Sequence, residues 1–209
     1  MSLPKRLAPA AFALCSSLLL PRDTLAHSPI PGIEGFYIGI LHPLSTPSQL
    51  LALLAVGVML GLRWPKWFTV TWVTFAAAML LGIGLEQFGM MPGGEEPMLL
   101  LVAVLAAMLS ALYPTGFLTT FVILLGICGI LIGILSTPDE GSVRATIITL
   151  SGSFVGANLA LIYMAGGVGW LRERFAQQWV RIGLRIIAAW IAAIGILMLG
   201  MAWRSFSTL

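Results

Sequence analysis

The sequence predicts an all-α membrane protein, a polytopic bundle of about six transmembrane helices whose first helix is broken near His42-Pro43. Of the 209 residues, 59% are hydrophobic and only 9% are charged, whereas a soluble domain carries about 25% charged residues. The mean hydropathy is +1.00. Lipid is therefore the solvent for most of the surface, and the length leaves room for about six spans with short connections.

Residues 1–26 have the pattern of a cleavable secretory signal. A basic start precedes an apolar stretch over residues 7–20, and a small-residue cleavage site follows. Cleavage after Ala26 would leave a single transmembrane domain, residues 27–209. An uncleaved anchor helix is the alternative, but the apolar stretch is short and interrupted for a span.

Six apolar segments follow the signal, and the basic residues between them predict their orientation. Lys and Arg collect in cytoplasmic loops, and here they cluster after the first segment and after the fifth, while the opposite loops are mainly acidic. This pattern predicts a multi-pass protein of the bacterial inner membrane, with the mature N-terminus and the C-terminus on the exported side. The segments are residues 36–62, 67–85, 97–113, 116–135, 145–169 and 183–203.

The first segment contains Pro43 and Pro47, each of which removes a backbone donor and disfavours a continuous helix. Residues 36–47 are therefore expected to form a short helix or a re-entrant piece, followed by a helix over about residues 48–62 that a nearby Ser or Thr caps. Non-helical backbone at membrane depth needs a cover of protein or water. The break should therefore lie inside the bundle or at its exported mouth.

The later segments carry small residues, a few polar residues and a basic connection. Glycines four residues apart let helix backbones approach closely. Asn158 either makes a hydrogen bond between helices or belongs to a polar substrate path. The basic stretch 171–181 is either a topology signal or a short amphipathic helix on the anionic inner leaflet. The glycine pairs are Gly57 and Gly61, Gly129 and Gly133, and Gly152 and Gly156.

Residues 35–57 read GFYIGILHPLSTPSQLLALLAVG. This stretch resembles the first-span signature of the HupE/UreJ family of hydrogenase and urease accessory membrane proteins. The remaining architecture is also similar, with a cleaved signal, a histidine at the mature N-terminus and six spans. The matching positions are Gly35, Phe36, Gly39, His42, Pro43, Leu50, Leu51, Ala52, Ala55, Val56 and Gly57.

Members of that family are regarded as permeases for nickel, and sometimes for cobalt, that serve hydrogenase or urease. The resemblance implies transport of a divalent metal, with Ni²⁺ or Co²⁺ as cargo and no resident cofactor. The family signature places a histidine, an aspartate and a second histidine together, and imidazole and carboxylate suit such metals. Here the aspartate position is Ser48 and the second histidine position is Gln49, so only His42 remains.

The resemblance therefore predicts a degenerate metal site. The ending of the fourth segment, LIGILSTPDEG, also lacks the histidines that the family usually carries there. If the signal is cleaved, the new amino group and the imidazole of His27 form a nitrogen chelate, which Glu34 and His42 would complete on the exported side. The alternative is that His27 is an ordinary terminus and His42 a structural residue at the break.

Two functions follow from these observations. The chain is a permease with a degenerate metal site, or it is a non-transporting accessory or structural subunit packed in a larger membrane complex. An enzyme is not expected, because the sequence shows no nucleophile with its base. The net charge of +3 gives no reason to expect a nucleic acid as partner. The expected partners are the lipid bilayer, a metal ion and, for the second function, the larger complex.

Overall fold

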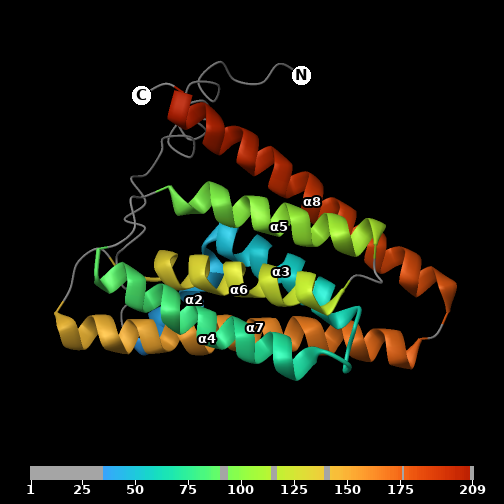
Figure 1. Ribbon diagram of the computed structural model, residues 1–209, viewed down its shortest axis with the longest axis horizontal. Coiled ribbons are helices and arrows are strands. Elements are labelled where there is room, and N and C mark those ends of the chain that lie inside the picture. Colours follow the sequence, from blue (N-terminus) through green and yellow to red (C-terminus); the bar gives the residue numbers. More distant parts are fainter. Residues whose placement is uncertain (1–34, 90–93, 114–116, 139–141, 176, 208–209) are drawn as a thin grey trace, which may run out of the picture. The chain divides into compact units, whose positions relative to one another are not determined.

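The regular structure is entirely α-helical in the residues that the computed structural model describes, which are 35–89, 94–113, 117–138, 142–175 and 177–207 (Figure 1). The predicted signal and its cleavage site lie outside these residues. All of the described helices belong to one compact unit, Ile33–Leu209. They are α2 (Phe36–Ser45), α3 (Pro47–Gly61), α4 (Phe68–Gln87), α5 (Glu95–Leu112), α6 (Leu118–Leu135), α7 (Val143–Arg174) and α8 (Gln178–Ser207).

Five of these helices, α4 to α8, are each long and apolar enough to cross a membrane. The α2–α3 pair passes the same test only when the two helices are taken together, and a bend of 75° separates them. The chain is therefore a multi-pass membrane protein with five spans, or six when the bent pair counts as one. The predicted polytopic helical bundle is confirmed.

The break in the first span lies at Thr46, a few residues beyond the predicted position at His42-Pro43. Thr46 has an extended backbone, with φ −87° and ψ 113°. Its N–H and its hydroxyl both donate to the His42 carbonyl, at 3.1 and 2.9 Å, so the hydroxyl closes α2 and does not cap α3. Pro47 then opens α3 in the first turn, where a missing N–H costs nothing.

Pro43 lies inside α2 and does not end it. In a regular helix the N–H of residue 43 would donate to the Gly39 carbonyl, and proline lacks that N–H. The Ser153 hydroxyl of α7 donates to this carbonyl instead, at 3.2 Å. Neighbouring helices commonly satisfy backbone groups that proline leaves free in a membrane, and this bond explains why α2 continues to Ser45.

The glycine pairs lie where helices meet backbone to backbone. A Cβ at Gly152 or Gly156 would overlap a carbonyl oxygen of α2, and one at Gly133 would overlap a carbonyl of α4. A Cβ at Gly61 would lie 2.7 Å from the Ala165 carbonyl oxygen of α7. The predicted close approach of helices at these pairs is confirmed, and each pair belongs to a different contact: α3 with α7, α6 with α4, and α7 with α2.

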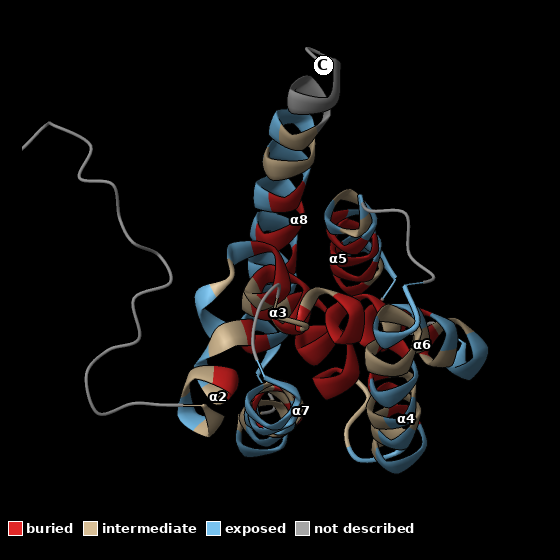
Figure 2. Cartoon of the chain, turned by 90° about the vertical axis from the view of Figure 1, so that its left-hand side faces the viewer, coloured by how far each residue is buried: buried red, intermediate tan, exposed pale blue. Residues whose placement is uncertain are grey.

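The central element is α3. Most of its residues are buried, and it contacts every other described helix. Figure 2 shows the buried residues concentrated on α3 and on the faces turned toward it. The break at Thr46 therefore leads directly into the interior of the bundle.

The described residues of the basic stretch 171–181 do not form a separate surface helix. Instead, α7 continues through Arg174 and α8 begins at Gln178, so the basic residues belong to the ends of two long helices. Of the two interpretations of this stretch, the short amphipathic helix is contradicted, and the topology signal stays a prediction.

Candidate functional site

Two buried polar residues and a half-buried histidine lie beside the break between α2 and α3. Ser48 and Gln49 are the second and third residues of α3, and each is only 1% exposed. His42 lies in the last turn of α2 and is half-buried. The structure thus places the three predicted first-span site residues on the two helix segments that flank Thr46.

Gln49 connects the start of α3 to the end of α6. Its Nε2 donates to the Leu135 carbonyl at 3.1 Å, and Leu135 is the last residue of α6. This end of α6 belongs to LIGILSTPDEG, the segment in which the resemblance implies further histidines. The fold therefore joins the two regions where the family signature and this sequence differ most.

Several oxygen atoms in this region are covered by protein and have no hydrogen-bond partner among the described residues. They are Ser48 Oγ, Gln49 Oε1 and Thr137 Oγ1. A buried polar atom without a partner costs about 1–3 kcal/mol, and such atoms are rare in native proteins. The start of α3 and the chain just after α6 therefore each carry a buried oxygen that no described residue satisfies.

These side chains offer neutral oxygens and one imidazole. Across the described parts of the chain, no three His, Cys, Asp or Glu side chains are grouped closely enough to hold a metal ion. His27 and Glu34, which were predicted to complete a site with His42, lie outside the described residues. The described donors would bind a divalent ion weakly, because no carboxylate among them balances its charge.

Asn158 makes the hydrogen bond between helices that was one of its two predicted roles. Its Oδ1 accepts from Trp72 Nε1 of α4 at 3.0 Å, and its Nδ2 donates to the Phe154 carbonyl at 2.8 Å. Asn158 is 6% exposed, so it joins α7 to α4 inside the bundle. Its place in a polar substrate path stays a prediction.

Some residues of this region were not found by sequence reasoning. Leu135 joins the site through the Gln49 bond, and Ser153 joins it through the Gly39 carbonyl. The only local signal was the run of hydroxyl residues in LIGILSTPDEG and in the fifth segment. Neither run identifies its partner, because the partners are distant in sequence.

Comparison with known proteins agrees with this architecture. The family model described as HupE / UreJ protein matches residues 14–198. No curated protein and no solved structure matches the chain. The matched range covers most of the sequence and includes the broken first span and the end of α6, and the protein therefore belongs to the HupE/UreJ family.

Proposed function

We propose that this protein is a low-affinity permease for a borderline divalent metal ion, Ni²⁺ or Co²⁺, and that the ion passes the break between α2 and α3. Family membership supports a membrane transport or accessory role. The observation that carries the proposal is the 75° break beside buried polar residues of the central helix. Many transporters form their substrate sites at discontinuous helices.

The donor set suits transient binding. The His42 imidazole is a good ligand for nickel or cobalt, while Ser48 and Gln49 supply neutral oxygens. Without a carboxylate at these positions the ion keeps most of its charge uncompensated, so it binds weakly. Weak binding favours release, which conduction requires as much as entry. On this proposal the metal is cargo, and the protein has neither an enzymatic activity nor a resident cofactor.

Entry would begin on the exported side of the bacterial inner membrane. His27, as the first residue of the mature chain, would chelate the ion through its amino group and imidazole, with Glu34 adding a carboxylate. The ion would then pass to His42. This order follows the predicted orientation, in which both mature termini are exported and positively charged loops remain inside.

Metal uptake by whole cells tests the proposal. Cells that express the protein should accumulate more radioactive nickel or cobalt than cells lacking it, and His42→Ala and His27→Ala should each lower the difference severalfold. Ser151→Ala is the matched control, because Ser151 is exposed and bonds only within α7 to the Ile148 carbonyl. Equal accumulation with and without the whole protein would rule out the permease.

The second candidate is a non-transporting subunit of a larger membrane complex. It is favoured by the lack of any grouping of three metal-ligating side chains in the described part of the chain. A family member that had lost its ligands would keep the helix packing while losing transport. Co-purification in fixed stoichiometry with other membrane proteins, together with unchanged metal accumulation, would support this function over the first.

A further inference from the structure

Several arginines lie near the end of α3, at one end of the bundle. Arg172, in the last turn of α7, donates through Nη1 to the Gly61 carbonyl at 3.5 Å and to the Leu62 carbonyl. These are carbonyls at the end of α3, where a helix leaves acceptors unused and carries a partial negative charge. Arg172 therefore has a structural role at the junction of α3 and α7.

Arg63 follows directly after this junction. Its guanidinium lies over the Trp67 ring, with Cζ 5.1 Å from the ring centroid. Its Nε and Nη2 are covered by protein and have no hydrogen-bond acceptor among the residues that the structure describes. The side chain as a whole is only half-buried, so part of it remains accessible. A guanidinium that has lost water without gaining an acceptor is costly unless an anion compensates it.

The surroundings add positive charge. Arg172 lies near enough to Arg63 and Arg181 for their positive charges to act on it, and the Glu173 carboxylate acts on it in the opposite sense. Lys66 also lies near this group, with Nζ 5.5 Å from the Trp67 ring centroid. Among the described residues of this group, the cations outnumber the carboxylate, and an anion would be attracted there.

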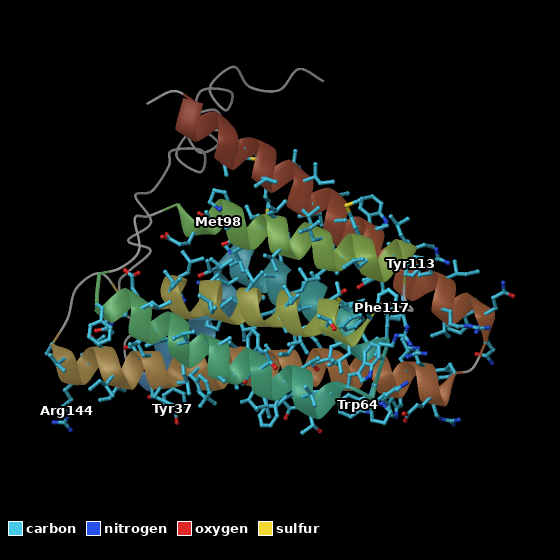
Figure 3. All side chains as sticks on the ribbon, in the orientation of Figure 1. Tyr37, Trp64, Met98, Tyr113, Phe117 and Arg144 are labelled. Carbon is cyan, nitrogen blue, oxygen red and sulfur yellow. The ribbon has the colours of Figure 1, made fainter. Side chains whose placement is uncertain are left out.

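Aromatic side chains place this group at the membrane surface. Trp64 packs against Gly169, because a Cβ there would overlap the indole, and its ring centroid lies 4.4 Å from that of Phe68. Tryptophans concentrate at the level of the lipid headgroups. In Figure 3, Trp64 lies at one end of the bundle and Arg144 at the other, and about 40 Å of α7 separates Arg144 from Arg172.

We propose that Arg63, Arg172 and Arg181 bind the phosphate of an anionic phospholipid. Guanidinium groups match the geometry of phosphate oxygens, and basic pockets between transmembrane helices hold anionic headgroups. Free phosphate has the same chemistry, but the ends of spanning helices and the surrounding tryptophans place the site beside lipid. The predicted orientation puts it in the cytoplasmic leaflet. This inference does not depend on metal transport.

Native mass spectrometry of the purified full-length protein tests the site. With mixed phosphatidylglycerol and phosphatidylcholine, the wild type should retain phosphatidylglycerol preferentially. Arg63→Gln should weaken this retention about fivefold, because it removes one positive charge. Arg63→Lys keeps the charge but loses the paired N–H donors of the guanidinium, so it should have a smaller effect. The matched control is Arg144→Gln, an exposed arginine at the opposite end of α7, which should bind as the wild type does.

Two outcomes of this measurement would overturn the proposal. Equal retention of both lipids would show that the arginines only set topology, and an equal loss in Arg144→Gln would show a general charge effect. A second measurement uses inorganic phosphate without lipid. If the wild type binds this phosphate and Arg63→Gln does not, the site belongs to free phosphate and the lipid proposal is overturned. Arg181→Gln serves as a second variant should Arg63→Gln not fold, since Arg181 is exposed. Circular dichroism checks folding of each variant.

Discussion

Neutral side chains at positions 48 and 49 explain how the start of α3 can be buried. An aspartate in place of Ser48 would bring a charge into a site that is 1% exposed, and a buried charge needs a partner or a metal. Ser48 and Gln49 are neutral, so burial of this part of α3 does not depend on a charged partner. Compared with the family signature, Ser48 and Gln49 also weaken any metal site there, because they stand in place of a carboxylate and an imidazole.

Restoring the family residues should therefore restore metal binding. The double variant Ser48→Asp with Gln49→His is expected to be less stable than the wild type without metal. Saturating nickel or cobalt should raise its unfolding temperature by roughly 5 °C or more, since ligand at a hundred times Kd stabilises by about 2.7 kcal/mol. Thermal unfolding in detergent, with and without metal, measures this.

The control for this variant is Ser110→Asp. Ser110 is also buried, at 2% exposed, but it lies on α5. The Ser110→Asp variant should lose stability to a similar extent as the double variant, and metal should not raise its unfolding temperature. If the double variant also shows no metal-dependent rise, the break is not the remnant of a metal site.

The position of His42, Ser48 and Gln49 beside a break could be predicted, whereas their contacts could not. The spacing of His42, Ser48 and Gln49 follows from the first-span signature, and their positions beside a break follow from two prolines. The Gln49 bond to Leu135 joins residues 86 positions apart, and the bond from Trp72 to Asn158 also spans 86 positions. Such contacts depend on how whole helices pack, so no local pattern in the sequence encodes them.

At the scale of the elements, proline proved a weaker helix breaker than expected. The prediction assumed that Pro43 would interrupt the helix, but the Ser153 hydroxyl replaces the lost donor and α2 continues to Ser45. Similarly, α7 was expected to end near residue 169, yet it extends to Arg174. Arg172 on this extension bonds the end of α3, which favours a continuous helix over a separate surface segment.

The bond from Ser153 to Gly39 makes a testable prediction about α2. Ser153→Ala leaves the Gly39 carbonyl without its donor and should lower the free energy of unfolding by about 1 kcal/mol. In a Pro43→Ala background the loss should be smaller, because the new N–H of residue 43 can donate to the same carbonyl. A double-mutant cycle on unfolding in detergent measures this coupling; strictly additive effects would contradict it.

The glycine pairs show a similar limit of sequence reasoning. Their four-residue spacing predicts close helix contact, and each pair lies at one. The sequence does not say which helix each pair meets, since a small surface accepts any partner of matching shape. Gly152 and Gly156 contact α2, while Gly129 and Gly133 contact α4.

At the scale of the whole molecule, the fold places the broken span at its centre. Because α3 contacts every other described helix, the polar start of α3 is covered by protein, as irregular backbone in a membrane requires. The same arrangement suits both the proposed permease and a packed accessory subunit. A measurement of flux separates these two functions directly.

The most direct test of the account is metal flux through the purified protein in liposomes. We predict influx of Co²⁺ or Ni²⁺ above that of protein-free liposomes, saturating only at high metal concentration, and reduced severalfold by His42→Ala. Ser151→Ala should leave the flux unchanged. Influx equal to that of protein-free liposomes, at every metal concentration and with the protein folded, would contradict passage of metal through the break between α2 and α3.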